Sequence, residues 1–211
     1  MGTSQSSNRP EISYIVSLYA RPEYLAACCW SLIGQRHTDF EVIVTDNTTD
    51  NKVARRQQQF IATLKDKRFR YVRTAGKIEV SDCYWSAEYG MKLAKGKWLC
   101  FPCEDCYYPP EWSQRLLAAA VGGNWDLALC ENIVVGPETC GSDRYMLVRV
   151  GTPSFPAYKP SFIVKAEKFP AWLNKPTITA CSGVDRTTMQ RMVADPAIRW
   201  GVVRDLFYVH N

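Results

Sequence analysis

The sequence predicts a mixed α/β fold with a mostly parallel central sheet flanked by helices. In the first half of the chain, short apolar runs rich in β-branched residues alternate with segments whose apolar residues recur at helical spacing. This alternation is typical of parallel sheets, whose strands are joined by crossover helices. The 211 residues are 46% hydrophobic and 22% charged, the balance of an ordinary globular domain. We therefore expect one compact domain, whose second half, from about residue 107, is less regular.

The expected elements of the first half begin with a buried strand at Ile12–Leu18. Pro22 is tolerated in a first helical turn, and the helix that it begins can end at Gly34. The same patterns predict strands at Phe40–Val44, Phe69–Val72 and Lys97–Phe101, and helices at Val53–Leu64 and Tyr84–Ala94.

The second half is expected to contain fewer regular elements. Proline and glycine become frequent between residues 137 and 160, and a loop of this length is often functional. The expected elements are helices at Glu111–Val121 and Thr187–Val193, and strands at Leu127–Val135, Tyr145–Val150, Ile198–Val203 and Leu206–Val209.

Charge, cysteine content and hydropathy limit the class of protein. A net charge of +5 suits an anionic small ligand and does not require nucleic acid. Nine cysteines leave at least one thiol unpaired, and Cys28 and Cys29 are adjacent, so a secreted disulfide framework is not expected. No apolar run reaches the 18 or so residues that a membrane span needs. We expect a cytoplasmic protein without a transmembrane segment.

Polar residues follow three of the predicted strands. Tyr19 to Arg21 follow the first strand, Asp46 the second, and Glu104 and Asp105 the strand that ends near Phe101. In open α/β sheets, ligands bind outside the carboxyl ends of the strands, so these residues should meet at one crevice. A carboxylate can accept from a ribose hydroxyl or hold a hard cation. For Asp46, capping of the next helix is an equal alternative.

Three blocks together resemble the family 2 glycosyltransferases of the GT-A fold. They are residues 15–25, residues 39–47, and residues 93–98 leading into Glu104 and Asp105. Their order and spacing match over about the first half of the chain. Within this family, the chain is similar to a domain of chlorovirus proteins that build capsid glycans. That likeness implies the host cytoplasm and further domains in a longer polypeptide.

The resemblance implies a UDP-sugar donor over residues 10–106 and a glycan acceptor over residues 107–211. It places Mn²⁺ or Mg²⁺ on Asp105 and His210, as a cation for the diphosphate charge. Cys103 stands where the family has the first Asp of its Asp-x-Asp motif, and a thiol is a poor Mg²⁺ ligand. The donor-binding residues implied are Ser17, Leu18, Tyr19, Arg21, Asp46, Glu104 and Asp105.

An inverting transfer requires a base for the acceptor hydroxyl, and a carboxylate is the usual choice. Asp185 stands in a turn like the one that carries the family's base, although it could instead stabilise the following helix through its dipole. Asp205 is the weaker alternative. Trp112 and Tyr107 are candidate acceptor walls, because sugars present apolar faces to aromatic rings. Either could equally pack the core.

Other functions remain open at this stage. A sugar-phosphate nucleotidyltransferase would share the sheet and the metal chemistry, but the segment from Leu18 to Glu23 contains no glycine and one basic residue. A non-catalytic glycan- or nucleic-acid-binding module is the second alternative. Cys100, Cys103 and Cys106 could form a redox or thiolate-metal motif. Burial as small hydrophobic residues explains these cysteines better.

Overall fold

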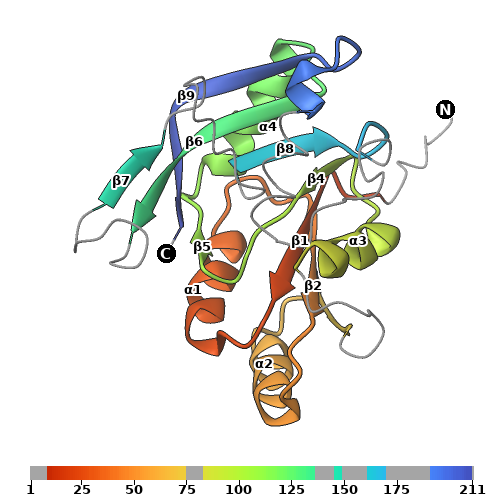
Figure 1. The fold of residues 1–211 in the computed structure, drawn as a ribbon, viewed down its shortest axis with the longest axis vertical. Helices are drawn as coiled ribbons and strands as arrows, with labels where there is room; N and C mark the ends of the chain where they lie inside the picture. The colour runs from red at the N-terminus through yellow and green to blue at the C-terminus, as the bar shows by residue number, and fades with distance from the viewer. Residues whose placement is uncertain (1–8, 75–82, 136–144, 149–160, 170–190, 211) are drawn as a thin grey trace, which may run out of the picture.

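The computed structural model describes residues 9–74, 83–135, 145–148, 161–169 and 191–210 (Figure 1). It confirms the predicted fold class, with helices flanking a central sheet that contains a parallel block. The helices are α1 (Pro22–Ile33), α2 (Asn51–Thr63), α3 (Cys83–Leu93) and α4 (Trp112–Gly122). The strands are β1 (Ile12–Leu18), β2 (Phe40–Asp46), β3 (Phe69–Arg73), β4 (Trp98–Cys100), β5 (Cys106–Tyr107), β6 (Leu127–Val135), β7 (Tyr145–Val148), β8 (Phe162–Lys165) and β9 (Trp200–His210).

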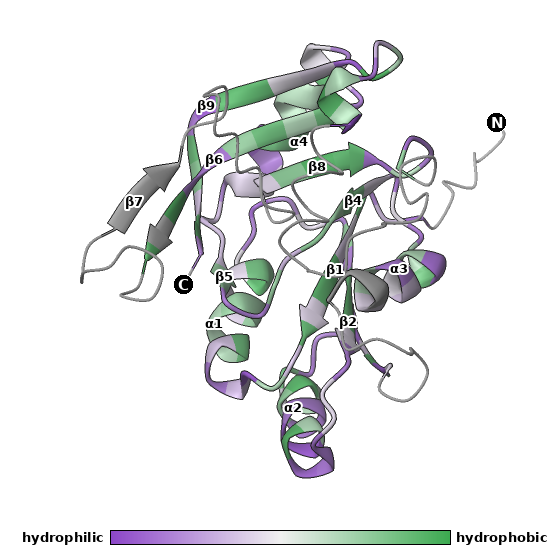
Figure 2. Cartoon of the chain, viewed as in Figure 1, coloured by the Kyte–Doolittle hydropathy of each residue, from purple (hydrophilic) through white to green (hydrophobic). Residues whose placement is uncertain are grey.

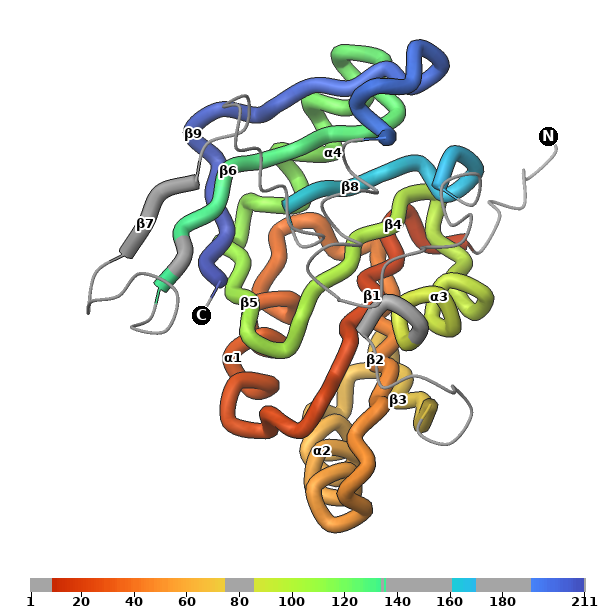
Figure 3. The backbone as a smooth tube through the Cα atoms, viewed as in Figure 1, coloured from red at the N-terminus to blue at the C-terminus, as the bar shows by residue number. Residues whose placement is uncertain are grey.

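The strands form a single sheet in the order β3-β2-β1-β4-β8-β6-β9-β5, with β7 paired to β6. The first four strands in this order are parallel. β8 pairs antiparallel with both β4 and β6, and so joins the two halves of the chain in one sheet. The tube in Figure 3 shows β9 turning downward at its C-terminal end, alongside β5.

Both faces of the sheet are covered, and β1 sends its side chains alternately to each of them. Tyr14 and Val16 belong to the core cluster that includes buried residues of α1 and α4. Ile15 lies in the opposite cluster with Leu99 and with Ala87 of α3. The strands are green along much of their length in Figure 2, whereas α2 is largely purple. This burial on both faces explains why the apolar residues of β1 do not alternate with exposed polar ones, and why Ser13 and Ser17 are buried as well.

Local sequence signals set the ends of the first two helices. α1 begins at Pro22, and the backbone N–H of Gly34 donates to the carbonyl of Trp30 at 3.0 Å. Asp50 caps α2 by accepting from the backbone N–H groups of Lys52 at 2.7 Å and Val53 at 3.3 Å. The Asp46 side chain makes neither contact, so the helix-capping alternative for Asp46 is wrong.

Two predictions for the second half need correction, and a third is tested only in part. β5 and β8 were not expected, because two- and four-residue strands carry too little periodicity to be recognised. The two expected closing strands are one strand, β9, with an irregularity between them. Cys130 of β6 pairs with Val203 and Glu131 pairs with Phe207, so residues 204–206 are inserted. Residues 187–190 of the expected late helix lie outside the described residues, while 191–194 are helical.

In the part of the chain that the structure describes, no helix has the length and apolar character needed to cross a membrane.

Candidate active site

The carboxyl ends of β1, β2 and β4 meet as the sequence predicts. Leu18 and Asp46, the last residues of β1 and β2, are paired in register. The segment after β4 lies against β1, because the backbone N–H of Ser17 donates to the carbonyl of Pro102 at 3.1 Å and Ser17 forms a bridge with Cys103. The loops carrying Tyr19, Asp46 and Asp105 are therefore neighbours at one edge of the sheet.

Asp46 is completely buried at this edge, and its carboxylate is engaged by the protein's own donors. Oδ1 accepts from the backbone N–H of Thr48 at 2.8 Å and lies 3.5 Å from Nη1 of Arg73. Oδ2 accepts from the hydroxyl of Tyr71. Burial and this hydrogen bond raise the pKa of Tyr71, which stays protonated and donates. Asp46 therefore organises the end of β2 together with Tyr71 and Arg73 of β3.

Glu104 holds the loop after β1. Both of its carboxylate oxygens lie 3.1 Å from the backbone nitrogen of Tyr19, which donates to them. Burial raises the pKa of Glu104 to about 7, the charge of Asp105 adds to this rise, and the N–H of Tyr19 opposes it. The Tyr19 side chain itself is half-exposed. Glu104 thus positions Tyr19, an expected donor-binding residue, through its backbone.

Asp105 meets His210 across the ladder between β5 and β9. β5 pairs antiparallel with β9, and Cys106 lies opposite His210 in the register. This pairing places Oδ1 of Asp105 3.5 Å from Nδ1 of His210. The second oxygen, Oδ2, accepts from Nη1 of Arg21 at 2.7 Å. The structure therefore brings together the two residues expected to hold a cation and adds a guanidinium beside them.

Two cysteines belong to the same cluster. The sulfur of Cys106 lies 3.7 Å from Nδ1 of His210 and 3.8 Å from Oδ1 of Asp105. The ligand atoms of Cys103, Asp105 and Cys106 all lie within 4.8 Å of one another. Burial raises the pKa of Cys106 well above its ordinary value, and a hydrogen bond to Cys103 adds to the effect. The Cys-x-x-Cys spacing was the sequence signal for this pair.

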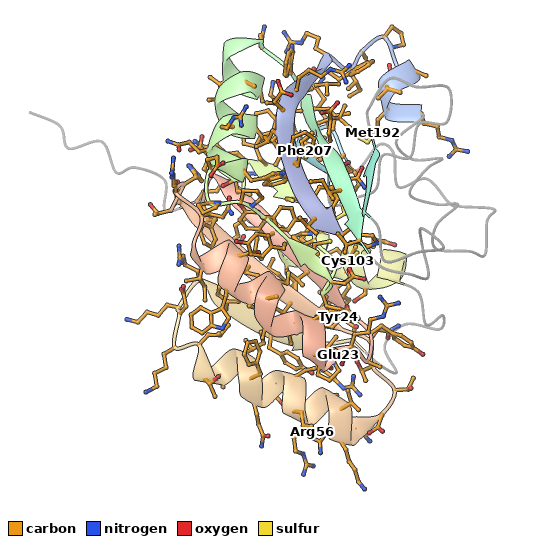
Figure 4. The ribbon with its side chains drawn as sticks, turned by 90° about the vertical axis from the view of Figure 1, so that its left-hand side faces the viewer. Glu23, Tyr24, Arg56, Cys103, Met192 and Phe207 are labelled. Carbon is orange, nitrogen blue, oxygen red and sulfur yellow. The ribbon has the colours of Figure 1, made fainter. Side chains whose placement is uncertain are left out.

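The interpretation of the three cysteines as buried hydrophobic residues holds for Cys100 and Cys106, which are both buried and belong to the core cluster. Cys100 is completely buried within β4 and belongs to the core cluster. Cys103 is only partly buried and shares the cluster of Asp105. In Figure 4, Cys103 is labelled near the middle of the view and Arg56 at α2. Cys103 is therefore the exception, although the sulfur of Cys106 also lies near Asp105 and His210.

Trp112 was expected at an acceptor wall, and the structure corrects this. Its side chain is completely buried at the start of α4. Its ring centroid lies 4.5 Å from that of Tyr108, and its Nε1–H donates to the sulfur of Cys130 at 3.1 Å. Trp112 is a core residue, because the apolar face of α4 turns it toward β6. Tyr107 is 47% exposed and stays available for an acceptor.

Of the two base candidates, Asp185 lies outside the described residues. Asp205 lies in the three-residue insertion of β9, with φ 56°. Its backbone carbonyl accepts from Nη1 of Arg115 in α4 at 3.2 Å. Five residues separate it from His210, about 16 Å along an extended strand. Asp205 is therefore remote from the cation cluster.

A hollow of about 510 Å³ lies at the opposite edge of the sheet. Trp98, the first residue of β4, lines it together with Arg9, Lys97 and Lys165. Because β4 runs parallel to β1, this is the edge away from Asp46 and Asp105. The hollow therefore does not belong to the cluster described above.

Taken together, the parallel block and the acidic cluster at its carboxyl edge define an α/β fold suited to binding a ligand at that edge. The chain belongs to glycosyl transferase family 2, whose profile it matches over residues 13–182. It has the GT-A fold. Comparison with curated protein sequences gives no match.

Two groups of solved structures share this fold. The 1–349 fragment of S. aureus TarS in complex with UDP-GlcNAc is 19% identical, with a TM-score of 0.70, over 94% of this chain and 58% of that fragment. The mannosyltransferase PcManGT from Pyrobaculum calidifontis, in complex with GDP-Man and Mn²⁺, is 18% identical, with a TM-score of 0.66, over 96% of this chain and 57% of that one. The chain spans only 36% of a longer TarS structure.

Proposed function

We propose that the protein is an inverting, divalent-metal-dependent glycosyltransferase that moves a hexose or deoxyhexose from a UDP-sugar to a glycan hydroxyl. The observation that supports this most directly is the 3.5 Å approach of Asp105 to His210 at the carboxyl edge of the parallel strands. Family membership supports the reaction class. The UDP-GlcNAc bound by TarS and the GDP-Man and Mn²⁺ bound by PcManGT support a nucleotide-sugar donor and a divalent cation.

In this proposal, the end of β1 and Asp46 bind the donor. Ser17, Leu18 and Tyr19 provide backbone groups at the edge, and Glu104 fixes this segment through the N–H of Tyr19. Asp46 binds the nucleoside by exchanging the hydroxyl of Tyr71 for a donor of the ligand. The exchange keeps the buried carboxylate hydrogen-bonded, which a buried charge requires.

Asp105 and His210 suit a divalent cation. A carboxylate oxygen and an imidazole nitrogen face each other, and Mg²⁺ or Mn²⁺ needs only one or two protein carboxylates when phosphates complete its coordination. When bound, the cation neutralises the negative charge that develops on the diphosphate leaving group. Arg21 is 55% exposed beside Asp105 and offers the same charge a guanidinium donor.

The acceptor side is proposed from Tyr107 and Asp185. Tyr107 presents an exposed ring next to Cys106, at the edge where β5 meets β9. Asp185 takes the proton of the acceptor hydroxyl as that oxygen attacks the anomeric carbon. A single displacement from the face opposite the diphosphate inverts the configuration.

A panel of UDP- and GDP-sugars with glycan acceptors, with Mn²⁺ or with EDTA, tests this function. Release of UDP that depends on Mn²⁺ is expected. Asp105→Asn should abolish the metal dependence of UDP binding measured by calorimetry. Asp185→Asn should stop transfer while UDP still binds. Glu88→Gln, which removes only a 3.2 Å ion pair on α3, is the matched control and should behave as wild type.

The alternative functions predict different products. A nucleotidyltransferase would make a nucleotide sugar from a nucleoside triphosphate and a sugar phosphate, and would release pyrophosphate. A binding module would release neither product, and steep salt dependence of oligonucleotide binding would indicate nucleic acid. Cytoplasmic location, the role in chlorovirus capsid glycosylation and further domains in the polypeptide stay predictions.

A further inference from the structure

The geometry points to a zinc site made by Cys103, Asp105, Cys106 and His210, which shares two ligands with the proposed donor cation site. Its four groups are two thiols, a carboxylate and an imidazole, all of which are zinc ligands in proteins. Soft thiolates select Zn²⁺ over Mg²⁺ or Mn²⁺. This cluster should therefore bind Zn²⁺ more tightly than Mg²⁺ or Mn²⁺.

The distances among three of the four ligands fit a tetrahedral ion. Three ligand atoms, Oδ1 of Asp105, Sγ of Cys106 and Nδ1 of His210, form a triangle with sides of 3.5, 3.7 and 3.8 Å. Zn–S bonds of about 2.3 Å and Zn–N or Zn–O bonds of about 2.1 Å place tetrahedral neighbours roughly 3.4 to 3.6 Å apart. Octahedral Mg²⁺, with bonds of about 2.1 Å, would require neighbours about 3.0 Å apart. The triangle therefore matches one face of a zinc tetrahedron more closely.

Cys103 supplies the fourth corner. Its sulfur lies within 4.8 Å of a carboxylate oxygen of Asp105 and of the sulfur of Cys106. The bridge between Cys103 and Ser17 fixes its backbone against β1, while β9 fixes His210. All four ligands are thus held by the sheet or by the short loop between β4 and β5.

The charges of the cluster balance when zinc binds. Each thiol releases its proton to solvent as its sulfur binds the ion, because the thiolate is the ligand form. Two thiolates and one carboxylate then carry three negative charges. Zn²⁺ supplies two positive charges, and Arg21, 2.7 Å from the other oxygen of Asp105, supplies the third. Neutral His210 completes the coordination without adding charge.

Such a site has a consequence for the proposed reaction. Four protein ligands close a zinc site, whereas a catalytic site keeps one position open. With Asp105 and His210 both on zinc, no ligand remains for a diphosphate-bound cation. Zn²⁺ and the Mn²⁺-bound donor therefore exclude each other. This consequence rests on the proposed function, whereas the zinc site itself does not.

Cobalt titration of the full chain tests the site directly. The metal-free protein, kept reduced with a phosphine, is titrated with Co²⁺, which reports tetrahedral thiolate ligation as near-ultraviolet charge-transfer and intense visible bands. We expect one Co²⁺ per chain, displaced by one equivalent of Zn²⁺. Cys103→Ser and Cys106→Ser should each weaken zinc binding by roughly 100-fold or more and reduce the thiolate band.

Cys29→Ala is the matched control. Burial raises the pKa of Cys29 to about 12, it lies in α1, and alanine suits a helix. This variant should keep the wild-type spectrum and stoichiometry. Far-ultraviolet circular dichroism should show that the serine variants are folded, and Cys103→Ser, at a partly buried position, is the milder change. A wild-type spectrum without a thiolate band, or the same band in both serine variants, would overturn the proposal.

UDP binding in the presence of Mn²⁺ separates the two proposals. Zn²⁺ should reduce this binding in the wild type and in Cys29→Ala, but much less in Cys103→Ser. If zinc binds with the expected spectrum while UDP never binds, the zinc site stands and the proposed function fails. If UDP binds with Mn²⁺ but no cobalt–thiolate band forms, the function stands and the zinc site is wrong.

Discussion

Asp126 is expected to anchor the first residues of β9, the strand that carries His210 at its other end. Its side chain is 2% exposed, and Oδ1 accepts from Nζ of Lys165 at 2.8 Å. Arg199 donates to Oδ2 from its backbone N at 3.1 Å and from Nε at 3.3 Å. The ends of β6, β8 and β9 thus meet at one carboxylate.

The Asp126→Asn variant should lower the free energy of unfolding by about 2–3 kcal/mol at neutral pH. Breaking a fully buried ion pair costs about 3–5 kcal/mol. Here water recovers part of that loss, because the side chains of Lys165 and Arg199 remain 27% and 53% exposed. For a chain of this size, the melting temperature should fall by roughly 5–10 °C.

The difference between wild type and Asp126→Asn should depend on pH. Burial alone would raise the pKa of Asp126, but hydrogen bonds from Arg199 and Lys165 outweigh it and hold the pKa well below the ordinary value of 3.8. A carboxyl group whose pKa is lower in the folded state than in the unfolded state stabilises the folded state at pH values above its unfolded pKa. This stabilisation is lost as the pH falls toward the folded pKa. The gap between the two proteins should therefore be full at pH 7 and shrink below about pH 4.

Urea unfolding followed by tryptophan fluorescence, over a series of pH values, measures both effects. Glu88→Gln is the control, because it removes a partly exposed pair on one helix and should change stability by at most about 0.5 kcal/mol. The reasoning is refuted if Asp126→Asn unfolds at the wild-type urea concentration, or if it keeps the wild-type loss of stability in acid.

Four further substitutions test the packing of the fold by urea unfolding. Trp112→Ala should lower the free energy of unfolding by about 3–5 kcal/mol, because the ring is completely buried. A decrease below about 1 kcal/mol would mean that the ring is not in the core. Ala20→Asn should add about 1 kcal/mol, since Ala20 has φ 58° and asparagine tolerates that region; no gain would argue against this loop conformation. Gly90→Ala should lower the free energy of unfolding by about 1–3 kcal/mol, because the new Cβ would lie 2.4 Å from Cγ2 of Ile15. Gly122→Ala has open space around it and should raise the free energy of unfolding by up to about 1 kcal/mol. Equal effects of the two substitutions would contradict the close packing of α3.

The first half of the fold follows from local patterns. Ile12–Leu18 was predicted as a strand with the bounds that the structure shows, and α1 begins and ends at the expected Pro22 and Gly34. These signals are local: an apolar run, a proline in a first turn, and a glycine after the last turn. β8 escaped prediction because four residues carry no clear period and its partners lie far away in the chain.

The sequence identified residues of the site, but it did not show which of these residues contact one another. Sequence reasoning named Asp105 and His210, yet their approach depends on pairing between β5 and β9, about one hundred residues apart. Cys106 was correctly predicted to be a core residue, but its spacing alone does not show that its sulfur also lies near His210. Asp46 was placed at the right edge, but its burial under Tyr71 depends on β3 lying beside β2.

By itself, the sequence determined the α/β class, the parallel first half and the edge of the sheet where polar residues collect. Periodicity and the direction of parallel strands decide these properties, and both can be inferred from short stretches of the sequence. Only the tertiary structure decided that Trp112 packs the core and that Asp105 and Cys106 lie near both Cys103 and His210. Long-range strand pairing sets those neighbours, and no local pattern encodes the distance between side chains on strands far apart in the chain.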